Sequence, residues 1–250
     1  MSKTIVITSQ KGGVSKTTTA TSLAHAFARQ GRNSLIVDFD PQGQSATILG
    51  MSPEPGIFNV LLGTSPTPGQ YIRQTGRENL YLLPGDRSTA TVQIVMGVEG
   101  RPMNAIAQVL KPLARDYHYI FFDTAPSVGG VQERAIWAAD YVIVPVATEY
   151  LSVDSLTHSL NTLKTLTAQH GWKGRLLGIL PTFYDTITKE SRNAMRYLNE
   201  HYPDLVLKPI HRATILRECA ADGQTIWEKA PDSSPAQDYA GLVKAIQKAG

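Results

Sequence analysis

Cysteine is almost absent from this sequence, which has only Cys219 among its 250 residues. A single cysteine excludes an intrachain disulfide and favours a reducing compartment. It also excludes an iron–sulfur cluster held between subunits by two cysteines from each. Cys219 stands in a helical pattern, Arg-Glu-Cys-Ala-Ala, where we expect it to be a small packing residue.

Long hydrophobic runs are also missing, since no apolar segment approaches the roughly 20 residues of a membrane-spanning helix. The first residues run straight into an apolar strand pattern, so we expect no signal peptide. The sequence also has no large excess of positive or negative charge. It contains 24 Lys and Arg and 21 Asp and Glu residues, which give a net charge of +3. Binding to nucleic acid must therefore depend on a local basic patch. These absences predict a cytoplasmic protein.

Hydrophobic residues make up 42% of the chain and charged residues 18%, which is typical of a globular protein. Apolar strand patterns lie at 5–8, 34–38, 79–84, 119–123, 141–146 and 176–183. Helical patterns lie at 16–30, 152–170, 188–201 and 235–249, and a short one near 57–62 within a Pro- and Gly-rich surface excursion. Alternation of buried strands with helices predicts a three-layer α/β fold, a doubly wound and mostly parallel sheet flanked by helices.

The segment 11–19, with the sequence KGGVSKTTT, is the most informative motif. A Gly-rich turn between a strand and a helix lets backbone N–H groups converge on phosphate oxygens. An ordinary phosphate loop has glycine at the positions of Gln10 and Ser15, whereas this one fits the deviant pattern K-G-G-x-x-K-[ST]. The alternative is a surface turn without a ligand. The predicted nucleotide contacts are Lys11, Gly12, Gly13, Val14, Ser15, Lys16, Thr17 and Thr18.

Three aspartates follow the strand patterns that lie near this loop. Asp38 and Asp40 close the second strand, and Asp123 ends the run Ile-Phe-Phe-Asp. Phosphate hydrolysis needs a metal near the β- and γ-oxygens and a group that orients the attacking water. A carboxylate after four buried residues is costly unless a cation or a hydrogen bond compensates it. The alternatives are that Asp38 and Asp40 cap a turn and that Asp123 is a helix N-cap.

Several motifs together resemble the ParA/Soj partition ATPases of the ParA/MinD superfamily. They are KGGVSKTTT at 11–19, DFDPQG at 38–43, FFDTAPS at 121–127, PVATEY at 145–150 and TFYD at 182–185. The resemblance covers essentially the whole chain and is strongest to the short ParA proteins. It implies a P-loop fold with a deviant Walker A motif, and we expect a single ATPase domain at 1–250 without an N-terminal helix-turn-helix extension.

The resemblance implies a Mg²⁺-dependent ATPase with a role for each lysine and aspartate of the site. Lys11 resembles the signature lysine, which reaches the ATP phosphates of a partner subunit as an arginine finger does. Lys16 serves the phosphates of its own subunit, and Asp40 matches the aspartate that positions the hydrolytic water, with Asp38 in support. Asp123 matches the Walker B aspartate, which acts on Mg²⁺ through water. The expected metal environment is Thr17, Asp38 and Asp123.

Other positions match the family less closely. Glu149 and Arg212 correspond to positions near the nucleotide in the dimer. Ser15 replaces the usual glycine, which would alter the geometry of the loop or slow turnover. His211-Arg212-Ala213 stands where Pro-Arg-Asn is usual, which leaves the adenine contacts open. Ile215 occupies a position that is often arginine.

The resemblance further implies a homodimer with ATP that binds DNA non-specifically on the nucleoid. A ParB-like partner would stimulate slow hydrolysis, so that plasmids or chromosomes are segregated. The expected basic residues are Lys189, Arg192 and Arg196 on one helical face, with Arg212 and Arg217 as an extension. The alternative for this face is a solvated helix surface.

Two related functions remain open at the level of sequence. One is the positioning of a protein organelle or a signalling cluster by the same ATPase. The other is a MinD-like membrane-cycling ATPase, which needs a basic amphipathic helix. The pattern at 235–249 carries Lys244 and Lys248 opposite an apolar face, but such a helix more often packs on the sheet, and we expect no stable membrane association.

Overall fold

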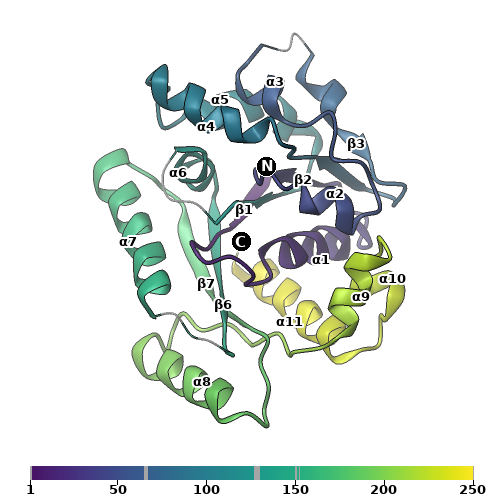
Figure 1. Cartoon of the computed structure of the whole chain (residues 1–250), viewed down its shortest axis with the longest axis vertical. Helices are drawn as coiled ribbons and strands as arrows, with labels where there is room; N and C mark the ends of the chain where they lie inside the picture. Colours follow the sequence, from purple (N-terminus) through teal and green to yellow (C-terminus); the bar gives the residue numbers. More distant parts are fainter. Residues whose placement is uncertain (1, 65–66, 127–129, 150, 152, 250) are drawn as a thin grey trace.

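In the computed structural model of the chain, seven strands form one sheet among the described residues (Figure 1). The structure describes residues 2–64, 67–126, 130–149, 151 and 153–249. The strands are β1 (Lys3–Ile7), β2 (Ser34–Asp38), β3 (Arg73–Gln74), β4 (Leu80–Leu83), β5 (Tyr119–Asp123), β6 (Tyr141–Ala147) and β7 (Arg175–Thr182). Their order is β3-β4-β2-β5-β1-β6-β7. All neighbours pair in parallel except β3 with β4, so the predicted mostly parallel sheet is confirmed.

The central strands contribute side chains to two separate hydrophobic cores, because successive side chains of a strand point to opposite faces of the sheet. In β1, Val6 belongs to one core and its neighbours Ile5 and Ile7 belong to the other. In β5, Phe122 and Phe121 divide in the same way. Burial on both faces explains why these strands read as continuous apolar runs.

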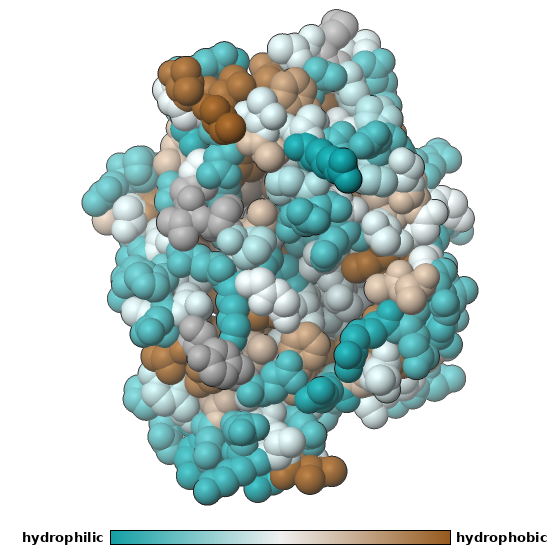
Figure 2. All heavy atoms as spheres, viewed as in Figure 1, coloured by the Kyte–Doolittle hydropathy of each residue, from teal (hydrophilic) through white to brown (hydrophobic). Residues whose placement is uncertain are grey.

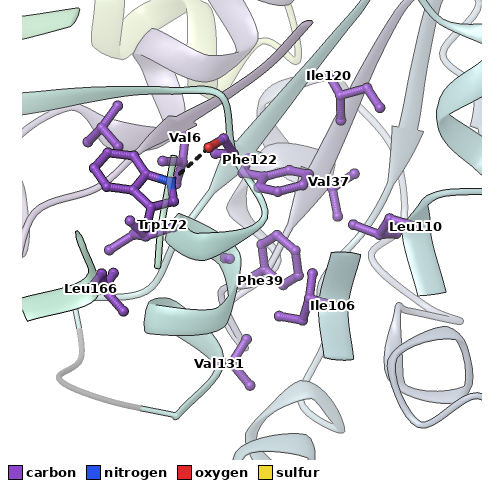
Figure 3. Close-up of a cluster of buried hydrophobic side chains, with 14 of the residues drawn as sticks. Val6, Val37, Phe39, Ile106, Leu110, Ile120, Phe122, Val131, Leu166 and Trp172 are labelled. Atoms are coloured by element: carbon purple, nitrogen blue, oxygen red, sulfur yellow. Dashed lines mark hydrogen bonds between the residues drawn. The ribbon is translucent and has the colours of Figure 1, made fainter. Parts of the chain in front are cut away.

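Among the described residues, the first core lies under six helices on one face of the sheet. They are α3 (Phe58–Leu61), α4 (Thr89–Val98), α5 (Ala105–Leu110), α6 (Gly130–Trp137), α7 (Val153–His170) and α8 (Lys189–His201). Figure 3 shows Phe39 directed at Phe122, with ring centroids 5.1 Å apart in an edge-to-face contact. The same view shows the indole of Trp172, which donates to the carbonyl of Ala139 at 2.9 Å.

The second core lies on the opposite face, under α1 (Lys16–Ala28), α2 (Gln44–Ile48), α9 (Ile215–Ala221), α10 (Ile226–Lys229) and α11 (Ser234–Ala249). Helices α1 and α11 lie side by side (Figure 1). The apolar residues of α11, among them Tyr239 and Ile246, are buried in this core. This packing agrees with the expectation that the helix covers the sheet. Cys219 is buried here too, as predicted.

The structure differs from the sequence prediction chiefly in short helices. Helix α1 ends at Ala28 and not near Gln30, and neither α4 nor α5 was predicted. Helix α4 has the sequence TATVQIVMGV, which contains no charged residue to mark a solvent-facing side. The excursion at 50–76 contains α3, as expected, the 3₁₀ turn η1 (Pro68–Tyr71) and the edge strand β3. A second 3₁₀ turn, η2 (Leu113–Asp116), precedes β5.

The surface of α4 is unusually apolar for a solvent-facing helix. Ile94 is 66% exposed and Val98 is 84% exposed. Figure 2 shows hydrophobic surface at the upper left, where Figure 1 places α4. Among the described residues, none of the helices combines the length and the apolar character required to cross a membrane.

Candidate nucleotide-binding site

A cleft of about 1030 Å³ opens at the carboxyl ends of the central strands. Ligands of doubly wound sheets bind at this edge, because the loops that follow parallel strands converge there. The segment after β1 lines the cleft from Gly12 to Thr18, and Gly13 and Ser15 adopt left-handed φ values of 70° and 66°. The loop after β2 contributes Asp40, and Glu149 and Arg212 line the same space. The predicted nucleotide contacts therefore line one cleft, with the exception of Lys11, which is not among the lining residues.

Lys16 is a buried cation on the floor of the cleft, with only 7% of its surface exposed. Its ammonium Nζ donates to the carbonyl oxygen of Lys11 at 3.0 Å. Burial lowers the pKa of Lys16, and the carboxylates of Asp123 and Asp40 partly offset this effect. The nearby carboxylates only partly compensate the burial of this positive charge. The ammonium of Lys16 therefore favours binding of an anion, such as the phosphate chain of a nucleotide.

Asp38 and Asp123 are adjacent on β2 and β5, and both are fully buried. Asp38 accepts the N–H of Asp40 at 2.8 Å through Oδ1 and the N–H of Ser45 at 3.1 Å through Oδ2. Burial and the neighbouring Asp123 raise the pKa of Asp38 well above its ordinary value. Because both oxygens of Asp38 accept backbone N–H groups, the carboxyl holds the loop after β2. This geometry is that of a positioning residue and does not favour the predicted ligation of the metal.

The two carboxylate oxygens of Asp123 differ in their hydrogen bonding. Its Oδ2 accepts the hydroxyl of Ser45 at 3.3 Å, whereas Oδ1 is buried with no hydrogen-bond partner among the described residues. Burial raises the pKa of Asp123 to about 6, against the opposing effects of the Thr17 hydroxyl and Lys16. An orphaned carboxylate oxygen beside a threonine hydroxyl fits Mg²⁺, which prefers oxygen ligands and retains several waters.

The metal would depend on the nucleotide for the rest of its ligands. Within the part of the chain that the structure describes, no group of three or more His, Cys, Asp or Glu side chains could hold a metal ion. Thr17 and Asp123 therefore supply too few ligands by themselves. Phosphate oxygens and water would complete the coordination, as is usual for Mg²⁺ in nucleotide sites.

The loop that carries Asp40 packs against the loop that follows β4. A Cβ on Gly85 would lie 2.4 Å from the carbonyl oxygen of Asp40, so only glycine fits this contact without a shift. Asp40 itself accepts the N–H of Gln42 at 2.9 Å and faces the cleft. Neither Gly85 nor Ser45 was predicted as a site residue. A glycine just after a strand, in Leu-Pro-Gly-Asp, was the available signal for Gly85.

Apolar side chains also line the cleft. Four that were not predicted are Ile48, Phe183, Leu216 and Ala220. At the rim, Arg212 Nη1 pairs with Glu149 Oε2 at 2.9 Å, and both side chains are about half exposed. A cleft that combines a phosphate loop with apolar side chains suits a nucleotide, whose base is planar and largely apolar.

The predicted basic face is only partly assembled. Lys189, Arg192 and Arg196 are exposed on α8, and the guanidinium of Arg192 donates to the carbonyl of Thr186 at 2.8 Å. Arg217, which was predicted to extend this face, instead lines the nucleotide cleft from α9. The role of Arg217 in DNA binding stays a prediction, and the spacing in sequence did not show that α9 belongs to the cleft wall. Ser127 and Tyr150, from the quoted motifs, lie outside the described residues.

Comparison with known proteins gives a consistent picture. A family model described as an AAA domain matches residues 2–174. The chromosome-partitioning ATPase Soj of Thermus thermophilus is 35% identical over 245 residues, which span 97% of this chain and 94% of that protein. The Soj protein of Bacillus subtilis, named a sporulation initiation inhibitor, is 30% identical and is covered over 100% of both chains.

Solved structures match over the whole fold as well. A Mycobacterium smegmatis protein, named cobyrinic acid a,c-diamide synthase and solved with bound ADP and magnesium, superposes with a TM-score of 0.86. It is 30% identical, and the match covers 99% of this chain and 95% of that one. The ATP complex of a Cyanothece McdA variant superposes with a TM-score of 0.89 at 25% identity, over 98% and 96% of the two chains.

Proposed function

This chain belongs to the family of Soj and ParA chromosome-partitioning ATPases, and on that premise we propose that it is an ATP-dependent dimerising switch. In this scheme ATP and Mg²⁺ join two subunits, the dimer binds DNA without sequence preference, and hydrolysis releases it. The observation that carries the proposal is the buried ammonium of Lys16 in the cleft wall, with Asp123 near enough to raise its pKa. The Oδ1 of Asp123 is buried and has no hydrogen-bond partner among the described residues.

The nucleotide would bind through its phosphates to the loop at 12–18. Backbone N–H groups and Lys16 would hold the phosphates, and Thr17 and Asp123 would hold Mg²⁺, with Asp123 acting through water. The metal would neutralise charge on the β- and γ-oxygens. The base would pack against apolar side chains of the cleft wall, such as Phe183.

Asp40 would orient the attacking water from its place in the cleft. Asp38 supports this role, because its Oδ1 accepts the N–H of Asp40 and so fixes the backbone beside the carboxylate. Lys11 would act in trans, as an arginine finger does, on the phosphates bound to a second subunit. Hydrolysis would be slow in the isolated protein and faster with a ParB-like partner, whose basic tail supplies Arg or Lys.

The DNA-bound cargo would be a plasmid or a chromosome, and the protein would act on the nucleoid. Positioning of a protein organelle or signalling cluster requires the same ATPase cycle and is the alternative. A MinD-like membrane cycle has less support, because the apolar face of α11 is buried against the body of the protein.

Two substitutions test the switch. We expect Lys16→Ala to abolish ATP binding, because it removes the buried cation that the phosphates require. We expect Asp40→Ala to bind ATP and form a stable dimer that does not hydrolyse it. ATP binding by calorimetry, and mass by light scattering after size exclusion, measure these outcomes. Lys208→Ala and Asp204→Ala, at exposed positions, are the matched controls. A monomeric Asp40→Ala protein in saturating ATP would contradict the scheme.

A further inference from the structure

Ser15 occupies a backbone conformation that normally belongs to glycine. Its φ and ψ are 66° and 30°, in the left-handed region, which L-residues with a Cβ rarely occupy. The loop is fixed on both sides of it. The carbonyl of Val14 accepts the hydroxyl of Thr182 at 3.3 Å, and the carbonyl of Ser15 accepts the N–H of Thr19 at 2.9 Å. Ser15 therefore holds one defined position at the start of α1.

The hydroxyl of Ser15 does not perform the usual task of a serine at this place. A serine that precedes a helix commonly accepts an N–H of the first turn with its side chain, from an extended backbone. The left-handed backbone of Ser15 prevents this arrangement, and its side chain makes no capping hydrogen bond. The donor of this hydroxyl is thus available for a ligand.

The surroundings of Ser15 favour an anionic ligand. The residue lines the cleft together with Lys16 and Thr17. Carbonyl oxygens of this loop are directed into the protein, since those of Lys11, Val14 and Ser15 each accept an internal hydrogen bond. Asp123 lies near enough to Lys16 to raise its pKa, and its Oδ1 is buried without a hydrogen-bond partner among the described residues. Such an oxygen suits a metal that carries phosphate ligands.

We propose that the hydroxyl of Ser15 donates a hydrogen bond to a phosphate oxygen of the bound nucleotide. It adds a side-chain donor at a position where glycine would supply only its backbone N–H. Hydrogen bonds to charged acceptors are stronger than those between neutral groups, so this contact contributes measurably to affinity. The inference rests on the proposed function, because it requires a nucleotide in this cleft.

Two variants at this position separate the hydroxyl from the backbone. Ser15→Ala removes the hydroxyl and keeps a Cβ on the left-handed backbone, whereas Ser15→Gly removes both. We expect both to bind Mg-ATP and magnesium tripolyphosphate about tenfold more weakly than the wild type, as for the loss of one charge-assisted bond. Thermal unfolding without ligand should stay unchanged in Ser15→Ala and shift upward in Ser15→Gly.

Calorimetric titration with Mg-ATP and with magnesium tripolyphosphate tests the role of the Ser15 hydroxyl. Wild-type affinity in Ser15→Ala would overturn the inference. So would weak binding in Ser15→Ala together with wild-type binding in Ser15→Gly, because the cause would then be the backbone. Failure of the wild-type protein to bind either ligand would instead refute the proposed function. Wild-type binding with an unaffected Ser15→Ala variant refutes only the role of the hydroxyl.

Discussion

At the scale of single residues, His25 shows how burial couples stability to pH. Its Nδ1 lies 2.6 Å from the hydroxyl oxygen of Thr225, and only 7% of the residue is exposed. Burial lowers the pKa of His25 from 6.5 to about 4. Glu228 opposes this shift, whereas Arg77 and Arg29 add to it. The folded protein therefore resists protonation of a side chain that the unfolded chain protonates near pH 6.5.

The sign of the pH dependence follows from this difference. Between the two pKa values the unfolded state binds more protons, so the free energy of unfolding falls as the pH is lowered below about 6.5 and levels off below about 4. We expect His25 to reduce stability by roughly 2 kcal/mol at about pH 5, relative to neutral pH. Urea unfolding at both pH values measures the effect.

The variant His25→Gln isolates this contribution. Carboxyls with raised pKa values, such as Asp123, act in the opposite direction, because the folded state takes up their protons first. Only the difference between wild type and variant therefore reports on His25. Identical pH profiles for the two proteins would contradict the assignment.

At the scale of elements, the loops after β2 and β4 depend on each other. Gly85 lies against the carbonyls of Asp38 and Asp40, where a Cβ would approach to 2.9 and 2.4 Å. The backbone of the loop after β4 thus supports the carboxylate that we propose to orient water. The sequence pattern did not show this contact, because Asp40 and Gly85 are 45 positions apart in the chain.

We expect Gly85→Ala to destabilise the protein by about 1–3 kcal/mol through overpacking. It should also lower ATPase activity, because the loop of Asp40 must shift. Gly97→Ala is the control, since Gly97 lies in α4 with open space at its Cβ, and this change should stabilise the protein by about 0.5–1 kcal/mol. Chemical denaturation and ATPase assays measure both. Equal behaviour of the two variants would refute the contact.

At the scale of the whole molecule, a net charge of +3 provides little general attraction to DNA. Non-specific binding to DNA would therefore depend on the local basic face of α8. Lys189 and Arg196 are exposed there, whereas Arg192 is engaged with the carbonyls of Thr186 and Ile187. The double variant Lys189→Ala/Arg196→Ala removes two charges without disturbing this loop.

With Mg-ATP, we expect this double variant to bind DNA more weakly and to reduce the log–log salt slope by about two, one for each phosphate contact. The control is Lys244→Ala/Lys248→Ala, which removes two exposed charges from α11. Fluorescence anisotropy over a range of salt concentrations measures the slopes. If both double variants match the wild type, the face of α8 does not bind DNA.

The sequence predicted the sheet and the phosphate loop well, because both depend on local information. A continuous apolar run marks a doubly covered strand, and β2 and β5 begin and end at the predicted residues, Ser34–Asp38 and Tyr119–Asp123. Helix α4 was missed because it has no charged residue to mark a solvent-facing side. The place of Arg217 in the cleft wall was not foreseen, because the pattern of one helix does not reveal which cleft it faces.

Local sequence patterns predicted a phosphate-containing ligand and the aspartates near it, since glycines, lysines and strand ends act through local backbone geometry. The different environments of these aspartates became visible only in the folded chain. Asp38 and Asp123 are 85 residues apart, yet they lie side by side on β2 and β5. Both oxygens of Asp38 accept backbone N–H groups, whereas Oδ1 of Asp123 has no hydrogen-bond partner in the described part of the chain. Such differences arise from contacts between distant segments, which no local pattern encodes.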